Sequence, residues 1–300
     1  MALADTAESA SSIPIVDTHV HFFDPRRPQG VPWPPKDNTA LYKPALPDRY
    51  RGIAGPLGIV GCIEVEASPL LEDNQWVLDI AAKDKIVVGT VGDLEPGKPD
   101  FAKQLERFHA NPLFRGIRYG NLWPRDTGHD DLGKALAKPE FVQGLKLLAQ
   151  AGLVLDTANP DPALIAAVVR ATDAVPDLRV VLDHMPRFEP PYPADLHELA
   201  KRKQVYMKIS GVPRWVDGHV SEDLSFYRGR LDDLFGLFGE DRVIYGSDWP
   251  NSDNFAPYAV GLKLVREYFT AKGQAIAEKY FWKNSVAAYR WVKRAPNQPG

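Results

Sequence analysis

The stretch Ile15-Val16-Asp17-Thr18-His19-Val20-His21-Phe22, near the N-terminus, determines how the rest of the chain is interpreted. Its Ile, Val and Thr residues favour a β-strand, in which alternate side chains point to opposite faces. His19 and His21 therefore leave the same face of this strand, with Asp17 in line behind them. Two imidazoles side by side on a rigid strand form half of a metal site that suits Zn, Fe, Ni or Cu. The alternative is a half-buried strand that merely carries two polar residues.

The bulk composition is typical of a soluble globular protein with a large core. The chain has 300 residues, a length at which α/β barrels commonly form one domain. A net charge of −3 and a pI near 6.2 give no electrostatic reason to expect nucleic acid or a membrane surface as a partner. Cys62 is the only cysteine, so no intrachain disulfide forms and a reducing compartment is compatible.

The two ends of the chain are expected to be flexible tails, at residues 1–12 and 294–300, around one domain at residues 13–293. No apolar segment approaches the roughly 18–20 residues that span a bilayer. The first residues also lack the basic and apolar regions of a secretory signal, so we expect a cytoplasmic protein. A homo-oligomer is compatible with the sequence.

A long loop follows the first strand, because residues 23–56 are rich in proline, which is excluded from helix interiors and central strands. Long loops in compact domains are often lids or binding loops. Trp33 and Tyr42 are candidates to cover a ligand there, although they could equally anchor the loop to the body.

The remaining sequence alternates strand-like and helix-like segments. The strand-like segments after the first are residues 59–65, 86–91, 114–119, 153–157, 179–184, 205–210 and 242–247. Several are nearly continuous apolar runs, as buried parallel strands are. Eight strand–helix units in one chain predict a single-domain (β/α)8 TIM barrel of the α/β class. An open doubly wound sheet is the alternative, but no Gly-rich phosphate loop follows any strand.

Polar residues recur where these strands end, and the carboxyl ends of barrel strands form the active site. After the histidine pair they are Glu64, Glu66, Arg118, Tyr119, Asp156, Asp183, His184, Lys208, Ser210 and Asp248. Charged side chains are rarely buried unless they are paired or bind a metal. The structural alternatives are a solvated strand end or an ion pair with Lys208 for Glu64 or Glu66, a salt bridge of Arg118 to a neighbouring strand, and helix caps at Asp156 and Asp183.

Five motifs resemble the amidohydrolase superfamily, and more finely its amidohydrolase-2 branch. They are residues 15–23 (IVDTHVHFF), 114–119 (FRGIRY), 180–185 (VVLDHM), 207–211 (MKISG) and 245–250 (YGSDWP). In order and spacing they look like the sugar-acid lactonases of that branch, which include L-rhamnono- and L-fuconolactonases, and like 2-pyrone-4,6-dicarboxylate lactonase. The resemblance implies a hydrolase that opens a small-molecule lactone, a cyclic carboxylic ester, in carbohydrate metabolism.

The resemblance also implies roles for individual residues. We expect a divalent ion, with zinc as its identity, to be bound by His19, His21 and Asp248, with Glu66 as a further ligand. Asp248 is expected to act as the base and His184 to orient the water or the oxyanion. The expected substrate-binding residues are Arg118, Tyr119, Trp33, Tyr42, Asn121, Trp123, Lys208, Arg187 and Trp249.

Three alternatives remain open at the level of the sequence. The histidines could act without a metal, since some lactonases of this type need none. Metal-dependent decarboxylases of the same branch carry a histidine on the fifth strand, whereas residues 153–158 here contain none. A barrel that binds a ligand without catalysis is the third alternative.

Overall fold

The computed structural model describes residues 13–120, 122–125, 128–129, 131–186 and 188–300. Eight parallel strands form one sheet, with each strand beside the next along the chain. In sheet order they are β1 (Ile15–Val20), β2 (Ile59–Val65), β3 (Val87–Gly92), β4 (Phe114–Arg118), β7 (Val154–Ala158), β8 (Arg179–Asp183), β9 (Val205–Ile209) and β12 (Val243–Tyr245). This arrangement confirms the predicted TIM barrel.

The barrel closes where its last strand meets its first. The backbone N–H of Asp248 donates to the carbonyl of His19 at 2.9 Å, and that of His21 donates to the carbonyl of Trp249 at 2.8 Å. The hydroxyl of Thr18 adds a hydrogen bond of 2.6 Å to the Tyr245 carbonyl. The two ends of the sheet are therefore joined next to the histidine pair.

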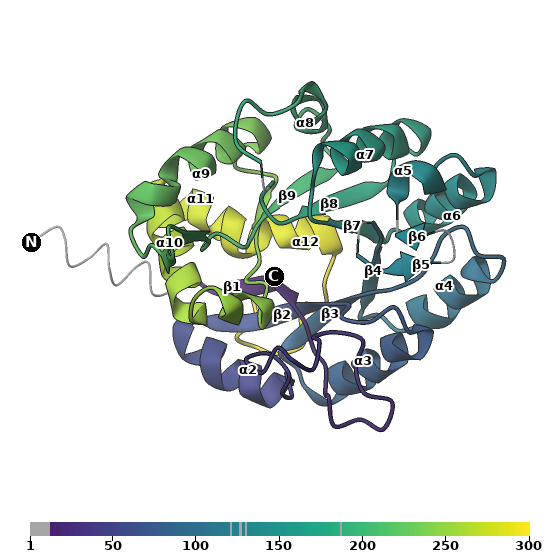
Figure 1. The fold of residues 1–300 in the computed structure, drawn as a ribbon, viewed down its shortest axis with the longest axis horizontal. Coiled ribbons are helices and arrows are strands. Elements are labelled where there is room, and N and C mark those ends of the chain that lie inside the picture. The colour runs from purple at the N-terminus through teal and green to yellow at the C-terminus, as the bar shows by residue number, and fades with distance from the viewer. Residues whose placement is uncertain (1–12, 121, 126–127, 130, 187) are drawn as a thin grey trace, which may run out of the picture.

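Helices surround the strands on the outside (Figure 1). They are α2 (Pro47–Ala54), α3 (Leu71–Lys83), α4 (Phe101–His109), α5 (Leu132–Ala135), α6 (Pro139–Gln150), α7 (Pro162–Ala174), α8 (Ala194–Leu199), α9 (Leu224–Phe238), α10 (Tyr258–Ala271) and α11 (Gln274–Glu278). The short helices η1 (Gly55–Leu57) and η2 (Asn251–Asn254) and a π-helical turn, η3 (Lys279–Lys283), complete the set with α12 (Asn284–Tyr289). Leucine, valine and alanine side chains of the helices pack against the strands, which are buried along almost their whole length.

The connections between the strands and helices of the barrel differ from the prediction in two ways. The proline-rich segment ends at Leu46, because Pro47 occupies the first turn of α2, where its fixed φ suits a helix and its missing N–H costs nothing. Two short hairpins, β5 (Pro124–Arg125) with β6 (Gly128–His129) and β10 (Trp215–Val216) with β11 (His219–Val220), lie in connections that the sequence left as loops.

The C-terminal segment is packed and is not the free tail that the sequence predicted. Gln298 is 2% exposed, and its side-chain amide donates to the carbonyls of Val60 and Lys85. Tyr289, on α12, belongs to the cluster of side chains that fills the barrel interior. Figure 1 shows α12, in yellow, crossing the strands instead of joining the outer ring of helices. The predicted N-terminal tail lies outside the described residues.

Within the part of the chain that the structure describes, no helix combines the length and the apolar character that crossing a membrane requires.

Candidate active site

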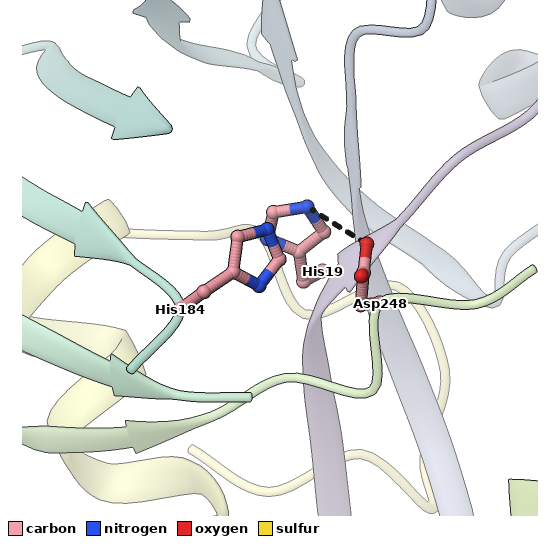
Figure 2. A group of neighbouring side chains, drawn as sticks. All are labelled: His19, His184 and Asp248. Carbon is pink, nitrogen blue, oxygen red and sulfur yellow. Dashed lines mark ion pairs between the residues drawn. The ribbon is translucent and has the colours of Figure 1, made fainter. Parts of the chain in front are cut away.

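Three side chains from distant parts of the chain converge at the carboxyl ends of the strands. His19 comes from β1, His184 follows β8 and Asp248 follows β12, as Figure 2 shows. One ligand atom from each lies within 4.8 Å of the other two. The rings of His19 and His184 are 4.6 Å apart, and Nε2 of His19 is 3.6 Å from Oδ1 of Asp248.

His21 completes a tight set of donor atoms around the same carboxylate oxygen. Its Nε2 lies 3.2 Å from Nε2 of His19 and 3.3 Å from Oδ1 of Asp248. A tetrahedral ion with bonds of ~2.0–2.1 Å places its ligand atoms about 3.3–3.4 Å apart. Nδ1 of His21 faces the carbonyl of Val65 at 2.7 Å, so in the neutral ring Nδ1 carries the hydrogen and Nε2 keeps its lone pair. The donors therefore fit a divalent ion such as zinc.

The electrostatics around Asp248 and the histidines keep their charge states distinct. Burial acts to raise the pKa of Asp248, but the neighbouring His184, His21 and His19 outweigh it and hold that pKa below its usual value. Burial, reinforced by Lys208, lowers the pKa of His19 well below its usual value. Burial likewise lowers the pKa of His184, so both imidazoles lose a proton more readily than a free histidine does.

The backbone is strained at two of these residues. His184 and Asp248 have φ of 71° and 63°, in the left-handed region that non-glycine residues seldom occupy. Such conformations persist only where the surrounding structure enforces them, and they cluster at functional sites. Here hydrogen bonds hold both residues: one joins Ser210 Oγ and Nδ1 of His184 at 2.8 Å, and the backbone N–H of Asp248 donates to the carbonyl of His19.

A buried charge cluster lies directly behind His19. The ammonium of Lys208 is 2.7 Å from Asp183, 3.1 Å from Asp156 and 3.3 Å from Nδ1 of His19. The phenol of Tyr289 donates to Asp156 at 2.7 Å. All of the acidic and basic groups in this cluster are fully buried, so it orients His19 from below.

A cavity of about 220 Å³ opens above Asp248. Several predicted residues line it: His21, His184, Asp248, Trp33, Glu66, Arg118 and Trp123. Glu66 and Arg118 form a buried ion pair, with 2.7 Å between Oε1 and Nε. The other oxygen of Glu66 accepts from the indole of Trp123 and the backbone of Ser68, both at 3.0 Å. Both oxygens of Glu66 thus accept hydrogen bonds from protein donors. His184, and not Glu66, lies beside His19 and Asp248 as a candidate metal ligand.

Four of the predicted substrate-binding residues do not line this cavity. Tyr119 packs on Phe141 in the core, because its side chain leaves the strand on the helix side. Trp249 is fully buried against Tyr50, and Lys208 lies in the charge cluster. Tyr42 lies on the loop between β1 and α2 and is not among the cavity-lining residues. Asn121 and Arg187 lie outside the described residues.

Two polar residues of the cavity, Asn159 and Asn251, were not predicted from the sequence. Asn251 donates to Oδ2 of Asp248 at 2.8 Å, so it holds the carboxylate oxygen that faces away from the histidines. Its position three residues after Asp248 is the only available signal, and asparagine is too common in loops for that spacing to be specific.

A second cavity, of about 350 Å³, shares Asn159, His184, Asp248 and Asn251 with the first. Its far wall carries Arg214, Arg230, Trp215 and Phe255. Glu189 is the acidic partner of both arginines, with Arg214 at 2.7 Å and Arg230 at 3.9 Å. Two cationic groups share one carboxylate here, which leaves this side of the mouth positive.

Comparisons with known proteins find relatives along most of the chain. L-fucono-1,5-lactonase of Burkholderia ambifaria is 28% identical over 248 residues, which are 79% of this chain and 80% of that enzyme. Among solved structures, an amidohydrolase from Burkholderia multivorans with bound zinc superimposes with a TM-score of 0.78, at 21% identity over 93% of this chain and 99% of that one. A second structure is described as a putative 2-pyrone-4,6-dicarboxylic acid hydrolase from Pseudomonas putida. It superimposes with a TM-score of 0.70 at 21% identity, over 93% of this chain and 98% of that one.

The family comparison covers nearly the whole barrel. The sequence model of the amidohydrolase family Amidohydro_2 matches residues 16–291, from the first strand to the segment beyond α12. This range includes His19, His184 and Asp248. The chain belongs to the amidohydrolase family.

Proposed function

We propose that this protein is a lactonase that hydrolyses a sugar-acid lactone at the site formed by His19, His21, His184 and Asp248. The observation that carries the proposal is the position of Asp248. Its Oδ1 lies between two imidazoles, at 3.3 and 3.6 Å, at the floor of an open cavity. The name of the Burkholderia ambifaria relative supports the same reaction class.

Ring opening by water requires a base, a group that returns a proton and stabilisation of the oxyanion. Asp248 is ionised, because its neighbours hold its pKa low. In the proposed reaction it accepts a proton from the attacking water. It then returns that proton to the ring oxygen when the ester C–O bond breaks, which gives the open hydroxy acid.

His184 is proposed to orient the water or to hydrogen-bond the developing oxyanion. The hydroxyl of Ser210 occupies its Nδ1, so Nε2 is the nitrogen left to act toward the cavity. Arg118 also lines the cavity, but its charge is compensated by Glu66. It is therefore suited to hydrogen bonding with hydroxyl and carbonyl oxygens of the substrate.

The metal part of the proposal assigns a divalent ion, with zinc as its identity, to His19, His21 and Asp248, with His184 adjacent. When bound, such an ion supplies positive charge that acidifies water and polarises a carbonyl. Elemental analysis of protein purified without chelator tests this assignment directly. If the purified protein contains no metal and its activity survives chelation, the result would favour catalysis by the histidines without a metal.

The substrate is proposed from the shape and charge of the mouth. Trp33 and Trp123 offer flat apolar faces in the cavity that a sugar ring can cover. The positive side formed by Arg214 and Arg230 suits a lactone with a carboxylate substituent, the class named for the Pseudomonas putida structure. A panel of neutral aldonolactones, dicarboxylate lactones and simple esters separates these substrates. Hydrolysis of each compound is measured by the fall in pH that the released acid causes.

A decarboxylase is the less favoured alternative. β7 ends with Asp156, Thr157 and Ala158, and no histidine stands on it. Asp156 is tied to Lys208 and Tyr289 below the cavity. The fifth strand therefore offers no additional imidazole at the site.

Substitution of the proposed base tests the function most directly. Asp248→Asn keeps the size of the side chain but removes its basicity, so we expect kcat for lactone hydrolysis to fall about 10²–10⁴-fold. Asp253→Asn is the matched control, because Asp253 lies in the helix η2 that follows Asp248, pairs with Arg49 and does not line the cavity. Near-normal activity of Asp248→Asn would overturn the proposed role.

A further inference from the structure

A chain of asparagine side chains leads from Asp248 to the surface loop. Asn251 Nδ2 donates to Asp248 Oδ2 at 2.8 Å, and Asn254 Nδ2 donates to Asn251 Oδ1 at 3.2 Å. Asn38 Nδ2 then donates to Asn254 Oδ1 at 3.3 Å. Every amide in the chain donates toward Asp248 and accepts from the side of the loop.

The local structure explains why two of these amides line up. Asn251 and Asn254 are the first and last residues of the 3₁₀ helix η2. Side chains at positions i and i+3 of a 3₁₀ helix eclipse each other, so both amides project on the same side. The helix follows directly from Asp248, whose carbonyl accepts the backbone N–H of Ser252 at 2.9 Å.

Asn251 determines which oxygen of Asp248 faces the site. The carboxylate has one oxygen near the imidazoles, and a rotation about its Cβ–Cγ bond would exchange the two. The hydrogen bond at Oδ2 opposes that rotation and keeps Oδ1 toward His19 and His21. This amide is therefore placed to position the proposed base without touching the reacting atoms itself.

Asn38 anchors the other end of the chain in the loop that carries Trp33. Its own carbonyl oxygen accepts the backbone N–H of Leu41, a residue that is 0% exposed. Trp33 lines the cavity and packs edge-on against His21, with 5.5 Å between the rings. A second tie reaches Asn254 from the β10–β11 hairpin, where the indole of Trp215 donates to its backbone carbonyl at 3.3 Å.

We propose that Asn38, Asn254 and Asn251 form a positioning chain that couples the loop over the cavity to the orientation of the Asp248 carboxylate. The proposal rests on the proposed function in that Asp248 is the reacting carboxylate. Amides do not titrate, so the coupling is mechanical. Asn38 supports Asn254, and Asn254 holds Asn251 against Oδ2 of Asp248. Removal of any of these amides therefore loosens the hold on the carboxylate.

A double-mutant cycle in two backgrounds tests the chain. Asn38→Ala and Asn251→Ala are made singly and together, first in the wild-type protein and then in Asn254→Ala. Zinc affinity, from competition with a chromogenic chelator, is measured beside kcat and KM. Losses at groups that orient metal ligands are typically 10–100-fold, so we expect Asn251→Ala to weaken zinc binding or kcat by about tenfold.

The expected signature is non-additivity that depends on the middle residue. In the wild-type background, Asn38→Ala should have a clear effect on kcat that largely disappears once Asn251 is already truncated. In Asn254→Ala the two effects should become independent, because residues with no shared partner add. Asn111→Ala is the matched control, since Asn111 caps Leu113 N at 3.0 Å at the opposite end of the barrel.

The outcomes separate this proposal from the proposed function. Independent effects of Asn38→Ala and Asn251→Ala in the wild-type background would overturn the chain, even in an active lactonase. Coupling in zinc affinity would support the chain even if every lactone in the panel failed as a substrate. Thermal unfolding identifies variants that have lost the fold, and Asn251→Ser, which retains a short donor, replaces Asn251→Ala in that case.

Discussion

Lys208 is a buried ammonium whose partners are all inside the barrel. Its distances to Asp183 and Asp156 are 2.7 and 3.1 Å, and none of the three side chains is exposed. A charge in this position is tolerated only because opposite charges and hydrogen bonds replace the lost hydration. The same groups stand behind His19, so stability and the geometry of the site depend on one cluster.

We expect Lys208→Met to lower the free energy of unfolding by about 3–5 kcal/mol, because it leaves buried carboxylates without a cation. Urea unfolding followed by circular dichroism measures this change. The double variant Lys208→Met with Asp183→Asn removes charge from both sides, so it should be less destabilised than the single variant. If the double variant lost more stability than the single one, the ion pair would not be the source of the effect.

Asp156 makes a pH-dependent contribution to stability. Burial raises its pKa from 3.8 to about 7, against the opposing effect of Lys208. The folded protein therefore retains this proton at pH values where the unfolded chain has released it. The stability associated with the protonated group is complete below about pH 4, declines as the pH rises and is lost above about pH 7.

Asp156→Asn mimics the protonated carboxyl at every pH. We therefore expect the Tm of this variant, minus that of the wild type, to increase from about pH 4 to about pH 7 and then to level off. Differential scanning calorimetry at constant ionic strength measures the difference. A difference that stays constant over this range would show that the pKa of Asp156 is not raised in the folded protein.

At the scale of elements, the loop between β1 and α2 contributes one wall of the cavity through Trp33. The indole lies against Phe23 and His21, at 5.3 and 5.5 Å between rings, so it is fixed in place before a substrate arrives. Ionic contacts of the segment with the barrel, including Arg27 with Asp73, hold the loop down. The loop is therefore a preformed wall rather than a free flap.

The two aromatic residues predicted to cover the ligand should differ in effect. Trp33→Ala removes a face of the cavity, so we expect KM for the lactone to rise about tenfold with a smaller change in kcat. Tyr42→Ala should leave both constants near the wild-type values, because Tyr42 does not line the cavity. Steady-state kinetics on the best substrate of the panel measures both. Equal increases in KM would indicate a loop effect instead of a direct contact.

The strands were predictable because buried parallel strands have sequences of short apolar runs that end in polar residues. The direction of individual side chains was not predictable for residues just beyond a strand. Arg118 and Tyr119 are adjacent, yet Arg118 lines the cavity and Tyr119 packs on Phe141. Asn251 was missed for a different reason, since its role depends on the turn after Asp248 and not on any periodic pattern. Helix α2 was missed because prolines dominate the surrounding segment.

At the scale of the whole molecule, the C-terminal segment ties the far end of the barrel together. Arg294 donates to the carbonyls of Ala81, Asp84 and Val87, where α3 ends and β3 begins. Two of these carbonyls also accept long backbone hydrogen bonds, Ala81 from Asp84 and Asp84 from Val87, both at 3.3 Å. A guanidinium that collects the carbonyls at this helix end therefore stabilises the connection. The base of the barrel is thus completed by the last residues of the chain.

We expect Arg294→Ala to lower the free energy of unfolding by about 1.5–3 kcal/mol, the usual range for hydrogen bonds to a charged donor. Lys293→Ala is the matched control, because the neighbouring side chain is exposed and reaches only the chain terminus. Urea unfolding compares the two. A loss no larger than that of the control would mean that these hydrogen bonds contribute little to the closed barrel.

The joint between β1 and β12 has a consequence for biosynthesis. His21 and Asp248 are 227 residues apart in the chain and 3.3 Å apart in the folded protein. At a synthesis rate of about 5–20 residues per second, His21 is added to the chain roughly 10–45 s before Asp248. Throughout that interval β1 has an unpaired edge, which favours association with other chains. A fragment that stops before β12 carries the imidazoles without Asp248, so activity that depends on the proposed base requires translation past that residue.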